Sequence, residues 1–454
     1  MNMHVYTTAF SKGKKRQTQS QAAFRPDTQG IEKGLINLYP QVEYQTIAGF
    51  GGAFTDAAGY VFCSMPAPQQ EVILDAYFGP GGLQYTWGRT HMDSCDFSLE
   101  QYEAVSDPGD TQLASFSLER ANRNILPMLT RANAKAGKPL AVMMTPWSPP
   151  AFMKTNGRRS YGGFLKKEYY PLWARYLCKY VRAYKDLGVD VQMLSVQNEP
   201  KAVQTWDSCI FTGEQEREFI RNHLRPEMAR TGLQDVSLLI WDHNKERAFE
   251  RACEVISDPE MDRNISGVAV HWYSGDHFEA LSMIRERFPE KRLVFSEACV
   301  EYLVYKDQNP LMNARMYAHE LIGGLNHGLD TFIDWNLVLN EQGGPNHAGN
   351  YCDAPIMCDT EGETVRKSLS YDYIGHFSRH ILPGAKRIGF SRFGQEVEVT
   401  VARNPDGSLC VVAMNPGDKD ISFHLRLKDA VCPALLPGDG ISTFVISEDA
   451  YAKS

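Results

Sequence analysis

Short apolar runs alternate with amphipathic stretches over most of the chain. Eight runs are rich in Val, Ile, Leu and aromatic residues and are bounded by turn residues, which predicts buried β-strands. They cover residues 46–54, 83–92, 140–146, 191–197, 237–241, 267–272, 292–296 and 331–335. Helical periodicity is found between them at 116–135, 166–187, 213–230, 245–257, 277–288 and 312–327. This order predicts parallel strands joined by right-handed helical crossovers.

Two α/β architectures fit this order, a closed (β/α)8 TIM barrel and an open doubly wound sheet. An open sheet that binds a dinucleotide carries a G-x-G-x-x-G turn after its first strand. Here the first strand contains Gly49-Phe50-Gly51-Gly52, which lacks that spacing. We therefore predict the barrel.

The pattern changes after about Pro383, where polar and apolar residues alternate as in antiparallel strands. Such strands are predicted at 397–401, 409–413, 421–425 and 442–446, with turns at 404–407 and 416–418. Residues 5–8 and 35–39 are also strand-like and precede the barrel. The prediction is a catalytic barrel over residues 45–380 and an antiparallel β-sandwich side domain built from residues 1–44 and 381–454.

The charge balance argues against nucleic-acid binding. The 454 residues contain 47 Lys and Arg against 55 Asp and Glu, a net charge of −8. Phosphate binding needs clustered cations, and the basic cluster Lys12 to Arg16 is interpreted as a solvated turn. No run of apolar residues is long enough to predict a membrane span.

The cysteines and the N-terminal residues are the parts of the sequence from which a cellular location can be predicted. No signal peptide is visible at the N-terminus. The ten cysteines are scattered without the spacing of a disulfide framework or of a zinc site. We therefore expect reduced thiols, a cytoplasmic location, no metal and no cofactor. A signal peptide removed by trimming would instead mean secretion. The oligomeric state is left open.

Two glutamates lie at the predicted carboxyl ends of barrel strands, where barrel enzymes carry their catalytic groups. Glu199 ends the fourth strand, within Gln197-Asn198-Glu199-Pro200, and Glu297 ends the seventh, after Phe295-Ser296. Glycoside hydrolysis needs such a pair of carboxyls. A single glutamate would more simply be a salt-bridged rim residue, but a pair placed in this way favours catalysis.

Aromatic and polar residues at other strand ends fit a sugar site. Trp147, Trp272, Tyr273 and Trp335 follow the third, sixth and eighth strands. Aromatic rings pack on the apolar faces of sugars, whereas hydroxyl groups need polar partners. Such partners are available at Asp96, Asn198 and Asn336.

Seven ordered motifs resemble glycoside hydrolase family 30, and together they extend from about residue 46 to about residue 380. They are Gly51-Gly52-Ala53-Phe54-Thr55-Asp56-Ala57, Met92-Asp93-Ser94-Cys95-Asp96-Phe97-Ser98, Pro146-Trp147-Ser148-Pro149-Pro150 with Met153-Lys154-Thr155-Asn156-Gly157, Gln197-Asn198-Glu199-Pro200, His271-Trp272-Tyr273, Phe295-Ser296-Glu297-Ala298-Cys299-Val300 and Asp334-Trp335-Asn336-Leu337. The C-terminal region resembles the side domain of the family more weakly.

The resemblance implies a retaining β-glucosidase that acts by double displacement, with Glu199 as acid/base and Glu297 as nucleophile. A general acid needs a raised pKa, so we expect Glu199 and Glu297 in different environments, with Arg89 beside Glu297. The other implied site residues are Asn198 at the sugar 2-hydroxyl, Asp96 and Trp147 at the 3-, 4- and 6-hydroxyl side, Trp335 as the stacking floor, Tyr273 near the nucleophile, and Phe97, His271 and Asn350 as further pocket positions. For His271 a structural role is equally compatible.

The leaving-group side departs from the family pattern. The segment Lys201 to Cys209 is short, with Trp206 as a candidate wall, and Glu301 adds a charge. We therefore expect a small soluble glycoside or oligosaccharide as substrate rather than a ceramide glycoside. Cys299 is interpreted as a packed thiol. The alternatives are the same mechanism as a β-xylosidase, β-fucosidase or β-1,6-glucanase, and a non-catalytic carbohydrate-binding barrel.

Overall fold

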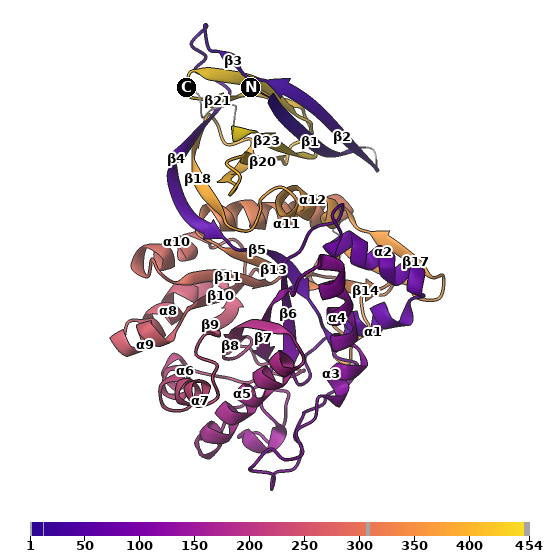
Figure 1. Ribbon diagram of the computed structural model, residues 1–454, viewed down its shortest axis with the longest axis vertical. Coiled ribbons are helices and arrows are strands. Elements are labelled where there is room, and N and C mark those ends of the chain that lie inside the picture. The colour runs from indigo at the N-terminus through magenta and orange to yellow at the C-terminus, as the bar shows by residue number, and fades with distance from the viewer. Residues whose placement is uncertain (1, 12, 306–308, 449–454) are drawn as a thin grey trace.

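A closed barrel of eight parallel strands forms the larger part of the molecule (Figure 1). The computed structural model describes residues 2–11, 13–305 and 309–448. The barrel strands are β5 (Gly49–Ala53), β6 (Trp87–Met92), β7 (Ala141–Pro146), β8 (Asp190–Ser195), β9 (Ser237–Asn244), β10 (Gly267–His271), β11 (Arg292–Glu297) and β13 (Thr331–Asn336). Each overlaps one of the eight predicted runs, so the predicted TIM barrel is confirmed.

The glycines of β5 have a packing role. One hydrophobic cluster contains a residue from each of seven barrel strands, with Trp87 of β6 as its largest member beside Met143, Met193 and Leu239. A Cβ atom on Gly51 would overlap the backbone of Trp87. The glycine at position 51 therefore lets β5 approach β6 closely in the barrel.

Helices cover the outside of the barrel (Figure 1). They are α1 (Asp56–Ser64), α2 (Ala67–Phe78), α3 (Glu119–Arg123), α4 (Ile125–Ala136), α5 (Tyr170–Asp186), α6 (Gly213–Phe219), α7 (Arg225–Arg230), α8 (Ala248–Ile256), α9 (Pro259–Asn264), α10 (Phe278–Arg287), α11 (Pro310–Asn326) and α12 (Leu369–Ser378). The predicted helix at 116–135 is broken at Asn124, and that at 213–230 contains a π-helical turn at Ile220–Leu224.

A ten-stranded sheet that folds over a second hydrophobic core forms the β-sandwich. Its strands are β1 (Asn2–Ser11), β2 (Lys14–Ala23), β3 (Arg25–Pro26), β4 (Leu35–Ile47), β18 (Ala385–Arg392), β19 (Glu398–Arg403), β20 (Leu409–Asn415), β21 (Ile421–Leu427), β22 (Ala430–Leu436) and β23 (Gly440–Ile446). β1 pairs with β23, so the two ends of the chain meet in one sheet. β4 and β18 extend from the sandwich towards the barrel, and α11 and α12 lie between the two parts (Figure 1).

Two details of the sandwich differ from the expectations. β4 and β21 run parallel, so the sheet is mixed rather than wholly antiparallel. Lys14, Lys15 and Arg16 begin strand β2 rather than forming a turn, and Lys15 is paired with Asp372. Residue 12 of the basic cluster and residues 1 and 449–454 of the predicted side domain lie outside the described residues.

Two further observations concern the molecule as a whole. All ten cysteines are free. In the part of the chain that the structure describes, no helix is long and apolar enough to cross a lipid bilayer.

Candidate active site

Glu297 is the last residue of β11, and both of its carboxylate oxygens are held by donors from neighbouring strands. Arg89 of β6 donates from Nη1 to Oε2 at 2.6 Å. The hydroxyl group of Tyr273, just beyond β10, donates to Oε1 at 3.0 Å. Two donors on two different oxygens fix the orientation of the carboxylate, as a nucleophile at the end of a barrel strand requires.

Arg89 connects this carboxylate to the rest of the site. Its Nη2 donates to Asn198 Oδ1 at 2.9 Å and to Asp242 Oδ2 at 3.0 Å. Burial opposes ionisation of the guanidinium, but the charges of Asp242 and Glu297 outweigh it and raise the pKa of Arg89. The predicted place of Arg89 beside Glu297 is observed, and the cation also positions Asn198 next to Glu199.

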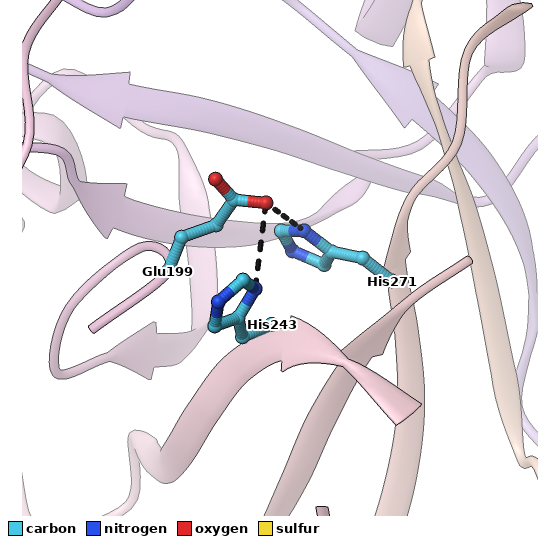
Figure 2. A group of neighbouring side chains, drawn as sticks. All are labelled: Glu199, His243 and His271. Carbon is cyan, nitrogen blue, oxygen red and sulfur yellow. Dashed lines mark hydrogen bonds and ion pairs between the residues drawn. The ribbon is translucent and has the colours of Figure 1, made fainter. Parts of the chain in front are cut away.

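Glu199 follows β8 in a strained conformation, with φ of 44° in the left-handed region. Such a backbone is uncommon for a residue with a side chain and is typical of functional sites. Its amide donates to the carbonyl of Asp242 at 2.9 Å. Its Oε1 lies 3.3 Å from Nδ1 of His271 and 3.5 Å from Nδ1 of His243 (Figure 2).

The protonation of Glu199 differs from the expectation. Burial by itself would raise its pKa, but the polar contacts and charges of His243 and His271 outweigh burial and lower the pKa of Glu199 well below its usual range. Burial opposes the charge on His271 too, yet Glu297, Asp242 and Glu199 raise the pKa of His271 to about 9. At neutral pH the free protein therefore holds its proton on His271, next to an ionised Glu199.

Asp242 and His243 are site residues that the sequence analysis missed. They lie at the end of β9, where Trp241 and Asp242 have φ of 73° and 49° and the pairing with β10 slips by one residue. The bulge turns Asp242 inward, where it lies 3.1 Å from His271 Nε2 and accepts from Ser296 Oγ at 2.5 Å. The polar run Asp242-His243-Asn244 at the end of a strand is the sequence feature from which these two site residues could have been predicted.

Two tryptophans and a phenylalanine form the aromatic part of the site. Trp147 and Trp335 stack with ring centroids 5.3 Å apart, and Phe97 meets Trp335 edge-on at 6.1 Å. The guanidinium carbon of Arg89 is 4.8 Å from the centroid of Trp147. Because Trp147 and Trp335 are only 2% and 1% exposed, a sugar would meet narrow strips of these rings rather than open faces.

Trp272 does not belong to this group, and its predicted place at the barrel mouth is wrong. Successive residues at the end of β10 point in opposite directions, so His271 and Tyr273 reach the site while Trp272 points away. Its ring packs against Tyr317 of α11 with centroids 4.9 Å apart, and its Nε1 donates to the carbonyl of Cys299.

Asp96, Asn350 and Asn336 were predicted to lie in the sugar pocket, and they differ in the hydrogen bonds that they already make within the protein. Asp96 is hydrogen-bonded by Asn350, while burial and the charges of Glu297 and Glu199 raise its pKa well above the usual range. Asn336 Oδ1 accepts from Thr55 at 2.6 Å, and its amide nitrogen has no partner among the described residues. The amide nitrogen of Asn336 therefore remains available for hydroxyl recognition, in addition to the carboxyl group of Asp96.

The predicted leaving-group side contains both aromatic and acidic groups. Trp206 is half-buried and packs against the cluster that holds Trp147 and Trp335. Glu301 lies in β12 (Val300–Glu301), which pairs with β15 (Cys352–Asp353). Burial, with the charges of Glu199 and Glu297, raises the pKa of Glu301 to about 7. The charge of Lys201, in the same segment as Trp206, helps to lower the pKa of Glu250.

Cys299 packs close to Glu297, against Cys352 and Tyr273. Its Sγ lies 3.1 Å from Sγ of Cys352 and 3.4 Å from the hydroxyl group of Tyr273. Burial raises the pKa of the Cys299 thiol well above its usual value. A buried thiol of raised pKa is a poor nucleophile, which fits the interpretation of Cys299 as a packing residue.

Comparison with known proteins gives a consistent result over nearly the whole chain. Residues 47–381 match the Glycosyl hydrolase family 30 TIM-barrel domain, and residues 384–444 match the family 30 beta sandwich domain. The lysosomal acid glucosylceramidase of Mus musculus is 32% identical over 428 residues, covering 90% of this chain and 83% of its own.

Two solved structures extend the comparison. The crystal structure of SrfJ from Salmonella typhimurium superimposes with a TM-score of 0.95 at 36% identity, covering 98% of this chain and 100% of that one. The endo-beta1,6-glucanase BT3312 superimposes with a TM-score of 0.88 at 25% identity over the same shares.

Proposed function

The chain belongs to glycoside hydrolase family 30, and from that premise we propose that it is a retaining β-glucosidase with Glu297 as nucleophile and Glu199 as acid/base. The observation that carries the proposal is the arrangement around Arg89. One buried cation binds Glu297 and, through Asn198, the segment that carries Glu199. Double displacement requires such a fixed carboxylate opposite a second one that exchanges a proton.

In the first step, Glu297 attacks the anomeric carbon while the bond to the leaving oxygen breaks and Glu199 gives that oxygen a proton. His271 Nδ1 lies 3.3 Å from Glu199 Oε1 and holds a proton in the free protein. We infer that this proton passes to Glu199 as the leaving group approaches. In the second step, Glu199 removes a proton from water, which attacks the anomeric carbon and releases Glu297.

Recognition of glucose is proposed on the polar groups that remain around the nucleophile. Asn198 is held by Arg89 at the expected place of the sugar 2-hydroxyl group. Asp96 is hydrogen-bonded by Asn350, and burial together with the charges of Glu297 and Glu199 raises its pKa. We propose that its carboxyl group binds a sugar hydroxyl group. Trp147 and Trp335 supply the apolar strips against which the sugar ring packs.

A β-1,6-glucanase is the second candidate, supported by the likeness to an endo-beta1,6-glucanase and by the leaving-group side. Glu301 and Trp206 together offer a carboxyl group and an aromatic ring, a combination suited to a second sugar. This combination also supports a small soluble glycoside or oligosaccharide rather than a lipid glycoside as the substrate.

Hydrolysis of a panel of aryl β-glycosides and of a β-1,6-linked glucan tests this proposal. We expect β-glucoside turnover to exceed β-xyloside and β-fucoside turnover, and the first product seen by NMR to be the β-anomer. Preference for xyloside or fucoside contradicts the glucose assignment, and release of the α-anomer contradicts retention. Faster cleavage of the glucan than of any small glucoside favours the second candidate.

A matched pair of variants separates the two glutamates. In Glu199→Gln we expect kcat/KM, which reports the first step, to fall strongly for aryl glucosides with poor leaving groups and much less for those with good ones, because only the former need a proton. In Glu297→Gln both kinds of substrate are expected to lose turnover. Equal losses for both kinds of substrate in Glu199→Gln would contradict its role as acid.

A further inference from the structure

We propose that Glu199, His243 and His271 form a binding site for a divalent transition metal ion, represented by Zn²⁺, and that the bound ion blocks the enzyme. Three side chains from three strand ends meet here, as Figure 2 shows. One ligand atom of each, a carboxylate oxygen or an imidazole nitrogen, lies within 4.8 Å of the others.

The separations are those that a tetrahedral ion requires. Zinc binds imidazole nitrogen and carboxylate oxygen at about 2.0–2.1 Å with tetrahedral angles, which places neighbouring ligand atoms about 3.3 Å apart. The Glu199 Oε1 atom lies 3.3 Å from His271 Nδ1 and 3.5 Å from His243 Nδ1. An ion at the centre of this group would leave one position open to water or to a substrate oxygen.

Both imidazoles are prepared for this role. Metal-binding histidines usually donate their second ring nitrogen to a carboxylate, which fixes the ring. His271 has that partner, because its Nε2 lies 3.1 Å from Asp242 Oδ1. His243 Nδ1 is buried and lacks a hydrogen bond of good geometry among the described residues, with Glu199 Oε1 at 3.5 Å as its nearest ion-pair contact.

The surrounding charge favours a dication. Besides Glu199, the carboxylates of Asp242 and Glu297 face His271, the latter with its Oε2 4.0 Å from Nε2. Arg89 is the cation that is buried with them. Two imidazoles and one carboxylate select zinc, copper or nickel over calcium and magnesium, which prefer oxygen ligands.

The effect on catalysis rests on the proposed function. An ion that binds Glu199 Oε1 and His271 Nδ1 displaces the proton of His271 to solvent. It then occupies the two atoms between which we infer that the catalytic proton moves. The leaving group then lacks its acid, and the second step lacks its base. We therefore expect reversible inhibition that is relieved when a chelator removes the ion.

Titration of the purified, chelator-treated protein with Zn²⁺ by calorimetry, and with Co²⁺ by visible absorption, tests the site itself. We expect one ion per chain and the absorption of a four-coordinate cobalt ion. His243→Gln and Glu199→Gln are each expected to weaken binding at least about 10- to 100-fold, the range seen when even outer-shell partners are lost. His319→Gln is the matched control, since His319 of α11 pairs with Asp276 and Glu398 away from this cluster.

Three outcomes overturn the proposal: no saturable Zn²⁺ binding by the wild-type protein, equal affinity in folded His243→Gln and Glu199→Gln, or a thiolate-to-cobalt band that places the ion at cysteines such as Cys299 and Cys352. Circular dichroism establishes that each variant is folded. Because binding is measured without substrate, a protein that binds Zn²⁺ at this site but hydrolyses no glycoside contradicts only the proposed function. Full activity with the site saturated contradicts the inferred inhibition.

Discussion

Replacing Arg89 by lysine tests how Glu297, the proposed nucleophile, is positioned. The guanidinium of Arg89 uses separate nitrogens for Glu297, at 2.6 Å, and for the pair Asn198 and Asp242, at 2.9 and 3.0 Å. A lysine ammonium is a single point charge on a different stem and does not reproduce this fork. The variant therefore keeps the charge, but we expect it to lose at least the bond to Glu297.

The size of the effect follows from that bond. A hydrogen bond to a charged group contributes about 1.5–3 kcal/mol, and about 1.36 kcal/mol corresponds to a tenfold change in rate. We expect kcat/KM of Arg89→Lys for an aryl β-glucoside to fall about 10- to 150-fold. The assay is initial-rate hydrolysis at low substrate concentration, with thermal unfolding measured on the same preparation.

Arg292→Lys is the matched control for this experiment. Arg292 begins the strand that Glu297 ends, and it pairs with Asp330 at 2.8 Å at the opposite end of the barrel. This variant should lose a similar ion pair while keeping kcat/KM near the wild-type value. If folded Arg89→Lys hydrolyses the glucoside as fast as the wild type, or if Arg292→Lys loses as much activity, the reasoning is refuted.

Three further predictions concern buried charges. His271 has a raised pKa of about 9, so the stability it contributes is complete below pH 6.5 and is lost as pH rises through about 9. In thermal unfolding across that interval, His271→Gln should flatten the decline by up to about 1.4 kcal/mol per pH unit, and an unchanged slope contradicts this. Lys245 and Glu320 are a buried pair joined at 2.6 Å, so Lys245→Met should lower the free energy of unfolding in urea by about 3–5 kcal/mol. Adding Glu320→Leu should restore most of that loss, and the same loss in the double variant would argue against an uncompensated charge. Glu301 has a pKa of about 7, so the pH profile of kcat/KM should show an inflection near pH 7 that disappears in Glu301→Gln; persistence of the inflection assigns it to another group.

The barrel could be predicted because its strands are short, rich in apolar residues and bounded by turn residues. Helices α1 and α2 were missed, since α1 is rich in small residues and buried on most sides, which leaves no clear amphipathic period. The parallel pairing of β4 with β21 was also out of reach, because alternation along a strand does not identify its neighbour. The pattern of polar and apolar residues therefore predicted where the strands lie better than it predicted which strands pair.

In the candidate site, too, the residues at strand ends could be predicted, whereas contacts that depend on an irregular strand could not. Glu199, Glu297 and Arg89 follow from strand ends and motifs, and the structure brings them into one network. Asp242 reaches that network only through the bulge at Trp241, a slip of register that a linear pattern does not reveal. The low pKa of Glu199 was also unexpected, because it depends on two histidines that are 44 and 72 residues away in sequence.

Trapping the enzyme with a 2-deoxy-2-fluoro glucoside tests the central claim most directly. The fluorine slows both steps, and a good leaving group lets the first proceed, so the glycosyl-enzyme accumulates. We predict that mass spectrometry of peptides finds one added fluoroglucosyl group per chain, on Glu297. A label on another residue, or no label while wild-type hydrolysis continues, would contradict the assignment of Glu297 as the nucleophile.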